Sequence, residues 1–135
     1  MSKVVHVAVG IISNNNQIFL TKRLEHVHQG GKWEFPGGKV EQGETVTEAL
    51  YRELKEEVAI DVVSSKPFME IRHDYGDKQV FLDIHIVNKY SGEPNAQEGQ
   101  KQAWFKLEQL KTLDFPEANK AIVEKLLGEF DMVAS

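Results

Sequence analysis

A regular pattern of apolar residues near the start of the chain predicts the first strand. Every second residue from 5 to 11 is valine or isoleucine, the period-two pattern of a β-strand. The residues between them are also largely apolar, which predicts a central strand covered on both faces. SNNNQ (13–17) then predicts a turn, and IFLTKR (18–23) predicts the returning strand of a hairpin.

A glycine-rich stretch and a helix follow. HVHQGGKWEFPGGKVEQGE (26–44) holds five glycines and a proline, which predicts a loop interrupted by a short extended piece. Thr45 and Glu48 form a T-x-x-E capping box at the start of a helix. No glycine or proline interrupts the sequence until well past residue 59, so we expect the helix to run about that far.

The second half predicts three more strands and a last helix. Residues 66–75 and 79–90 are extended segments, 91–100 are a polar loop, and AWFKL (103–107) is a short strand. Pro116 precedes the last helix, whose buried stripe is Ala118, Ile122 and Leu126. No repeat or linker divides residues 1–135, so we expect one domain of the α/β (α+β) class, a mixed sheet between helices.

Composition and charge narrow the possible partners. The 135 residues are 41% hydrophobic and 27% charged, as in an ordinary globular domain. A net charge of -5 argues against a broad grip on DNA or RNA, which needs clustered Lys and Arg. Small anionic ligands stay possible, because a divalent metal can bridge acidic protein to phosphate.

The sequence also bears on compartment. It has no cysteine, which excludes disulfides and thiolate metal sites. The start, MSKVVHVAVGII, lacks the long apolar core and cleavage site of a signal peptide. No apolar run approaches the roughly 20 residues of a membrane span. We therefore expect a cytoplasmic protein without membrane contact.

The stretch RELKEEVAI (52–60) gathers three acids on one side of the predicted helix. At about 100° per residue, Glu53, Glu56 and Glu57 fall within an arc of about 100°. The same arc carries apolar residues of the first half of the helix: Val46, Ala49 and Leu50. The acids therefore continue the face that should pack inward, whereas a solvated acidic face would lie opposite it.

Carboxylates turned toward the protein body are costly unless they are paired or bind a metal. Arg52 can pair with only one or two of them. Three clustered carboxylates suit Mg²⁺ or Mn²⁺, and a structural ion-pair cluster is the alternative that the spacing leaves open. An EF-hand is excluded, because the acids lie within a helix.

The segment GKVEQGETVTEALYRELKEEVAI (38–60) resembles the signature of the Nudix hydrolase family, G-x5-E-x7-R-E-U-x-E-E-x-G-U with U a bulky aliphatic. The fixed positions that fit are Gly38, Glu44, Arg52, Glu53, Leu54, Glu56, Glu57 and Ile60. One position departs, since Ala59 stands where the signature has glycine. A glycine there would serve as a left-handed helix stop, a conformation that costs alanine about 1–2 kcal/mol.

The resemblance extends from about residue 4 to residue 127. VAVGII, KWEFPGGK, EPNAQEGQ with a following Trp, and DFPEANKAIVEKL are similar to one branch of the family. That branch cleaves nucleoside triphosphates to monophosphate and pyrophosphate, with 8-oxo-dGTP as the substrate that matters. The resemblance implies the Nudix fold, a mixed β-sheet sandwiched between α-helices, and Mg²⁺-dependent sanitation of the nucleotide pool against mutation. We expect a monomer that binds no nucleic acid polymer.

The resemblance also assigns residues by position. It implies a metal site of the Gly37 carbonyl and four acids: Glu53, Glu56, Glu57 and Glu98. Arg52 resembles the arginine that orients the helix carboxylates. The positions assigned to the substrate are Arg23, His28, Glu34, Phe35, Gly37, Gly38, Lys39 and Asn119, with Lys39 as a phosphate contact.

Attack of water on a polyphosphate needs charge neutralisation, a positioned water and a base. Mg²⁺, or Mn²⁺ in its place, supplies the first and polarises the second, and a free carboxylate takes the proton. We expect Glu53 to be this base, with Glu44 or Glu98 as alternatives.

Several of these residues also have plainer interpretations. His28, with His26, is typical of a solvated loop. Phe35 is either core filler or a base-stacking surface. Asn119 either lies in the first turn of the last helix or contacts the base, since an amide offers both donor and acceptor. A Nudix hydrolase for another nucleoside diphosphate derivative and a non-catalytic nucleotide-binding module remain alternative functions, although the presence of every signature acid weighs against the second.

Overall fold

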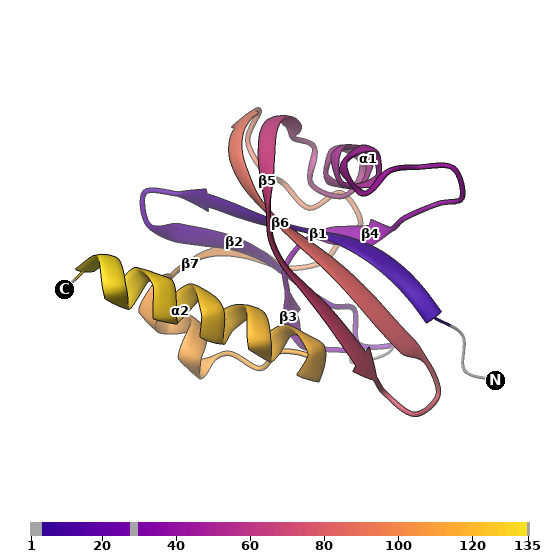
Figure 1. Ribbon diagram of the computed structural model, residues 1–135. Helices are drawn as coiled ribbons and strands as arrows, with labels where there is room; N and C mark the ends of the chain where they lie inside the picture. Colours follow the sequence, from indigo (N-terminus) through magenta and orange to yellow (C-terminus); the bar gives the residue numbers. More distant parts are fainter. Residues whose placement is uncertain (1–3, 28–29, 135) are drawn as a thin grey trace.

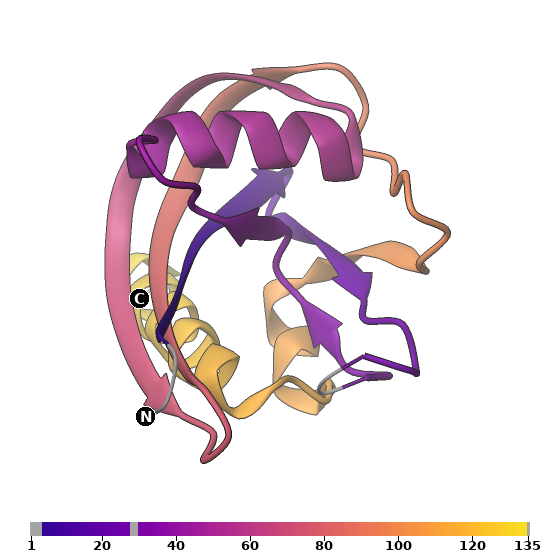
Figure 2. The same cartoon turned by 90° about the vertical axis from the view of Figure 1, so that its right-hand side faces the viewer.

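A mixed sheet lies between two helices. The structure is a computed structural model that describes residues 4–27 and 30–134. Within these residues, seven strands form one sheet in the order β3-β2-β1-β6-β5, with β4 paired to β1 and β7 paired to β2. β1 runs parallel to β6 and antiparallel to β2 and β4. Figures 1 and 2 show α1 over one face of the sheet and α2 over the other.

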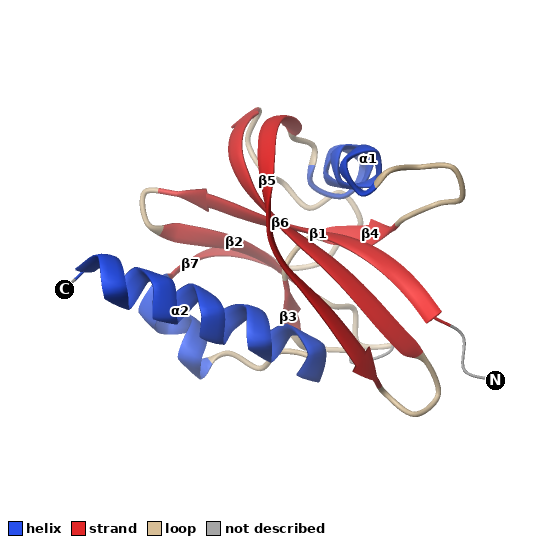
Figure 3. Ribbon diagram, in the orientation of Figure 1, coloured by secondary structure: helices blue, strands red, loops and turns tan. Residues whose placement is uncertain are grey.

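The elements follow the predicted order, as Figure 3 shows. The strands are β1 (Val4–Asn14), β2 (Gln17–Lys22), β3 (Trp33–Glu34), β4 (Gly37–Lys39), β5 (Asp61–Asp74), β6 (Gln79–Ser91) and β7 (Gln102–Lys106). The helices are α1 (Val46–Val58), α2 (Lys120–Ala134) and the short 3₁₀ helices η1 (Leu107–Thr112) and η2 (Glu117–Asn119).

Two local motifs form as the sequence predicts. The β1–β2 hairpin closes through Asn15 and Asn16, whose φ angles of 53° and 64° are typical of a tight type I′ turn. Thr45 caps α1, because its hydroxyl accepts a hydrogen bond from the Glu48 N–H at 3.1 Å and the Glu48 carboxylate accepts one from the Thr45 N–H at 2.9 Å. Both motifs depend on neighbours in sequence, which explains why the sequence reveals them.

The end of α1 shows the consequence of the departure at residue 59. Ala59 has φ 61° and ψ 31°, the left-handed conformation that a glycine adopts without strain. Its N–H still reaches the Lys55 carbonyl at 3.1 Å, so the helix ends in the expected way. The alanine therefore carries backbone strain at this turn.

The prediction from sequence placed the start of one strand wrongly and missed two short elements. β5 begins at Asp61, five residues before the expected strand, because these residues pair with the end of β6. This segment is an edge strand with irregular pairing and mostly exposed side chains, so it shows no clear apolar period. η1 was not expected, and β4 is a separate short strand whose partners are distant in sequence.

Two apolar clusters fill the space on either side of the sheet. Val9 and Ile11 of β1 belong to the cluster that also contains Ile122 and Leu126 of α2. Ala8 and Ile12 of β1 belong to the other cluster, with residues of α1. This confirms a central strand covered on both faces. Ile122 and Leu126 are buried in α2 as predicted, whereas Ala118 is buried but belongs to η2, because α2 begins only at Lys120. No helix in the described residues is long and apolar enough to cross a membrane.

Candidate active site

The carboxylates of α1 differ in their exposure. Glu57 is buried at 7% exposure, and the Glu53 side chain is 20% exposed. The expectation that all three acids turn inward is wrong for Glu56, whose side chain is 62% exposed. Glu56 lies at the edge of the arc, one turn beyond Arg52, and its carboxylate lies 3.3 Å from the Arg52 guanidinium.

Arg52 is the centre of an ion-pair network. Its Nε and Nη2 donate to both carboxylate oxygens of Glu44, at 2.8 and 2.9 Å. Its Nη1 donates to Glu53 at 2.6 Å, and its Nη2 also donates to the Lys39 carbonyl at 3.0 Å. The network therefore ties α1 to the preceding loop and to β4, and it fixes the position of the Glu53 carboxylate.

This network also changes the acidity of Glu44. The hydrogen bonds from Arg52, with a further one from the Glu41 N–H, lower the pKa of Glu44 to about 2. A carboxylate with so low a pKa is a weak proton acceptor near neutral pH. The geometry therefore favours Glu53 over Glu44 as a base, and it favours Glu44 as the residue that orients Arg52.

Two glycines of β4 allow the acids of α1 to approach the sheet. The Gly37 N–H donates to the Glu57 carboxylate at 3.1 Å. A Cβ on Gly38 would overlap the Glu53 carboxylate, and a Cβ on Gly37 would overlap the Ala8 carbonyl of β1. Any larger residue at either position would push β4 away from its neighbours.

Glu57 lies in an electrostatically unfavourable place. Burial, together with the charges of Glu34, Glu98 and Glu53, raises its pKa to about 8, against the lowering effect of the hydrogen bond from Gly37. Burial also raises the pKa of Glu34, despite an ion pair with Arg23 at 2.7 Å. A buried acid among other acids is stabilised when a cation binds.

The loop from 92 to 101 brings Glu98 to this cluster. The loop is held on the end of α1 by hydrogen bonds from the Asn95 N–H to the Val58 carbonyl and from the Gln97 N–H to the Glu57 carbonyl, both at 2.9 Å. Glu98 itself is exposed, yet its charge raises the pKa of both Glu34 and Glu57. Segments far apart in sequence thus bring these acids together.

The acids present fit a hard divalent cation by their chemistry. Carboxylates with one backbone carbonyl are the oxygen donors that Mg²⁺ and Mn²⁺ prefer. In residues 4–27 and 30–134, however, no three such side chains are already grouped as metal ligands. Arg52 holds Glu53 and Glu56, and the Gly37 N–H holds Glu57, so the side chains would have to turn from these partners to share a cation.

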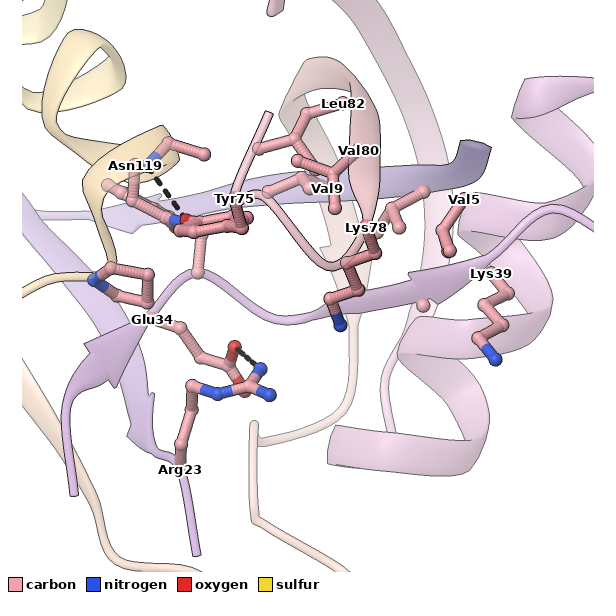
Figure 4. Close-up of a pocket in the computed structure, with 16 residues that line it drawn as sticks. Val5, Val9, Arg23, Glu34, Lys39, Tyr75, Lys78, Val80, Leu82 and Asn119 are labelled. Atoms are coloured by element: carbon pink, nitrogen blue, oxygen red, sulfur yellow. Dashed lines mark hydrogen bonds and ion pairs between the residues drawn. The ribbon is translucent and has the colours of Figure 1, made fainter. Parts of the chain in front are cut away.

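A cavity of about 240 Å³ opens beside β4. Figure 4 shows the residues that line it, which come from the β5–β6 hairpin, from η2 just before α2, and from β1, β3 and β4. Every described residue that the resemblance assigned to the substrate lines it: Arg23, Glu34, Phe35, Gly37, Gly38, Lys39 and Asn119. His28, also assigned to the substrate, lies outside the described residues.

The structure adds wall residues that sequence reasoning missed. Tyr75 and Lys78 lie at the β5–β6 turn, and the Tyr75 hydroxyl accepts a hydrogen bond from the Ala118 N–H at 2.9 Å. The apolar wall consists of Val5, Val7, Val9, Val80, Leu82, Pro116 and Ala118. The alternating valines of β1 were visible in the sequence, but their pattern does not distinguish a cavity wall from a packed core.

Asn119 and Phe35 each have both a structural role and a place in the cavity wall, the two interpretations that the sequence left open. Asn119 ends η2, directly before α2, and its N–H donates to the Pro116 carbonyl at 2.9 Å. Its half-buried side chain lines the cavity. Phe35 is buried and stacks on Phe115 with ring centroids 5.7 Å apart, and it too lines the cavity.

Comparison with known proteins agrees with this architecture. The family model of the NUDIX domain matches residues 7–125, so the chain belongs to the Nudix family of hydrolases. It is 42% identical to the 8-oxo-dGTP diphosphatase of Escherichia coli (strain K12) over 92% of this chain and 97% of that protein. It is 40% identical to the enzyme of the same name from Haemophilus influenzae, over 94% of each chain.

Solved structures confirm the predicted fold. A MutT structure, from work on the proteins of Aliivibrio salmonicida and Vibrio cholerae, is 39% identical with a TM-score of 0.83, covering 94% of this chain and 99% of that one. The ORF135 protein of E. coli is 28% identical with a TM-score of 0.83, covering 94% and 91%. The mixed sheet between helices is therefore the Nudix fold.

Proposed function

We propose that this chain hydrolyses 8-oxo-dGTP, and dGTP more weakly, to the monophosphate and pyrophosphate, and so removes oxidised guanine from the nucleotide pool. The observation that carries the proposal is that the cavity and the acidic cluster of α1 adjoin each other at β4. Gly37 and Gly38 form part of the cavity wall and also touch the carboxylates of α1. A nucleotide with its base in the cavity would thus have its phosphates beside the acids. The relatives named 8-oxo-dGTP diphosphatase support the choice of base.

The cavity has the character of a site for a flat base. Valines of β1, with Val80 and Leu82 of β6, form an apolar wall, and Asn119 is one of the polar side chains that also line the cavity. Pockets of this kind bind an aromatic ring by apolar contact and fix its orientation with a few polar groups. Lys39 lines the cavity and is exposed on β4, which supports its role as a point charge that contacts a phosphate.

The residues that would hold the cation are those of the acidic cluster. They are the Gly37 carbonyl, Glu53, Glu56, Glu57 and Glu98. When bound, Mg²⁺, or Mn²⁺ in its place, would neutralise the polyphosphate and make the attacking water more acidic.

The remaining chemistry falls to side chains of α1 and its loop. Glu53 takes the proton of the attacking water, because Arg52 fixes one of its oxygens while the chain packs against Gly38. Glu44 holds Arg52 with both of its oxygens and so keeps Glu53 in place. The cavity and the acids that border it can be assembled from one chain, and we propose that the protein acts as a monomer in the cytoplasm.

Pyrophosphate release over a nucleotide panel, with and without Mg²⁺, tests the proposal. The panel holds 8-oxo-dGTP, dGTP, dATP and CTP. CTP is included because a relative named CTP pyrophosphohydrolase, from E. coli (strain K12), is 32% identical over 84% of this chain and 83% of that protein. We expect Mg²⁺-dependent turnover that is fastest for 8-oxo-dGTP. Faster turnover of CTP than of 8-oxo-dGTP would contradict the proposed substrate and indicate a CTP pyrophosphohydrolase. Binding without turnover would indicate a nucleotide-binding module.

A further inference from the structure

Thr21 of β2 is fully buried, and its hydroxyl has no hydrogen-bond partner. Among the described residues it is the sole buried side-chain polar atom in this condition. Buried hydroxyls in folded proteins are nearly always paired, so an unpaired one calls for an explanation. The position of Thr21 beside the proposed site suggests what that explanation is.

The pairing of β2 defines the surroundings of the hydroxyl. Thr21 lies directly opposite Glu34 of β3 on one side and Gln102 of β7 on the other. Residues opposite each other in antiparallel strands have Cβ atoms about 4.5–5.5 Å apart and point to the same face. The Thr21 and Glu34 side chains therefore share one face of the sheet, close enough for a change of rotamer to bring the hydroxyl to the carboxylate.

In the free protein Glu34 has a donor just past the end of β2. Arg23 follows Thr21 by two residues, and its guanidinium lies 2.7 Å from the Glu34 carboxylate, as Figure 4 shows. Arg23 also lines the cavity and is one of the residues assigned to the nucleotide. If Arg23 turns to a nucleotide, the half-buried Glu34 carboxylate needs another donor, since Glu57 and Glu98 are acids as well.

We propose that Thr21 is a positioning residue, whose hydroxyl donates a hydrogen bond to the Glu34 carboxylate once bound nucleotide has drawn the Arg23 guanidinium away. This inference rests on the proposed function, because it needs a nucleotide in the cavity. The unpaired hydroxyl of the free protein is then held ready for the bound state. In that state Glu34 keeps its position in the acidic cluster although it has lost its ion pair.

A binding experiment without turnover tests the inference. The affinity of the product, 8-oxo-dGMP, is measured by calorimetry in EDTA for the wild type, Thr21→Val and Thr21→Ser. Valine has the shape of threonine without the hydroxyl, and serine keeps the hydroxyl. Ile18→Val is the matched control. Ile18 is a buried residue of β2, as Thr21 is, but it packs in the apolar cluster beneath α2, away from Glu34. Thermal melts of the unliganded proteins accompany each measurement.

We expect Thr21→Val to bind 8-oxo-dGMP at least about tenfold more weakly, the loss typical of one hydrogen bond to a charged group. Its melting temperature should stay the same or rise, because the unpaired buried hydroxyl has gone. Thr21→Ser and Ile18→Val should bind within about twofold of the wild type, since neither removes the hydrogen bond.

Equal affinity of Thr21→Val and the wild type would overturn the inference while leaving the proposed function intact. Weaker binding by both Thr21 variants, together with lower melting temperatures, would show a packing role and overturn it as well. Failure of the wild type to bind 8-oxo-dGMP would overturn the proposed function itself, and this inference with it.

Discussion

The acidic end of α1 and the adjoining cavity are two halves of one site with opposite construction. The acids lie close together in sequence and are held by charged contacts, with Arg52 paired to Glu44, Glu53 and Glu56. The cavity is lined by residues of β1, β3, β4, the β5–β6 hairpin and η2, with Arg23 just past β2, and half of these residues are apolar. The contacts of Arg52 arise from one helix and the loop just before it, whereas the cavity arises from the packing of distant segments.

This difference indicates that the acids serve cation binding and chemistry, whereas the cavity selects the ligand. A dense set of charges costs free energy in the free protein, as the raised pKa of Glu57 shows, and such a cost is typical of a site that binds a cation or does chemistry. An apolar cavity with few polar groups costs little and selects a ligand by shape and edge contacts. Changes in the first half should therefore alter rate and pH dependence, and changes in the second should alter substrate choice.

The largest expected effect is that of Glu53→Gln. We expect kcat to fall by at least about 100-fold, because the change removes a base that acts in the transition state, while the fold stays intact. Rates at saturating Mg²⁺ and a thermal melt measure both effects. Glu70→Gln, an exposed acid on β5, is the control. A Glu53→Gln rate above about a tenth of the wild-type rate would contradict the role given to Glu53.

A second large effect concerns pH and stability in the absence of metal. The pKa of Glu57 is about 8 in the folded protein against 4.5 as its ordinary value, so the folded state binds this proton more tightly. The stability it contributes is full below about pH 4.5 and is lost as the pH rises through 8. We expect the free energy of unfolding to fall by the order of 2–5 kcal/mol over this range.

Glu57→Gln should remove most of this pH dependence, because glutamine cannot ionise but still accepts a hydrogen bond from the Gly37 N–H. Urea unfolding in EDTA at pH 5 and pH 8 measures it for both proteins. Added Mg²⁺ should then stabilise the wild type more than the variant, and a raised Mg²⁺ requirement for turnover should accompany the change. Parallel pH profiles of the two proteins would show that Glu57 is not the titrating group.

Asn119→Ala is expected to act on the cavity half alone. Oxidation at C8 turns the N7 acceptor of guanine into an N–H donor, and the amide oxygen of Asn119 can accept from such a donor. A paired amide contact distinguishes bases by about 1–3 kcal/mol, so kcat/KM should fall roughly tenfold more for 8-oxo-dGTP than for dGTP. The Mg²⁺ dependence should not change. Equal losses for both nucleotides would make Asn119 a general purine contact or a helix-start residue.

The smallest expected effect is that of Ala59→Gly, which tests whether the end of α1 influences catalysis. Ala59 adopts the left-handed conformation, so Ala59→Gly should raise the free energy of unfolding by about 1 kcal/mol, after allowance for the greater freedom of glycine in the unfolded chain. The rate should stay unchanged, because the acids precede this turn. Thermal melts and kcat measure the two effects. A large loss of activity would show that the alanine tunes the site.

The sequence indicated the parts that depend on near neighbours. The capping box, the two-asparagine turn and the period of β1 each lie within a few residues, and each forms as expected. The start of β5 was misplaced because edge strands have little need of an apolar period. Of the three acids of α1, spacing alone made Glu56 an inward residue, whereas its contact with Arg52 leaves it exposed.

The sequence by itself determined the family, the acidic helix and its cap, because 23 neighbouring residues carry them and helical spacing places side chains i and i+4 together. Only the tertiary structure decided that Glu34 and Glu98 would reach Glu57, that Tyr75 and Lys78 would complete the cavity, and that Thr21 would be buried without a partner. Burial and electrostatic repulsion depend on which distant segments pack against one another, and a local pattern carries no record of that packing.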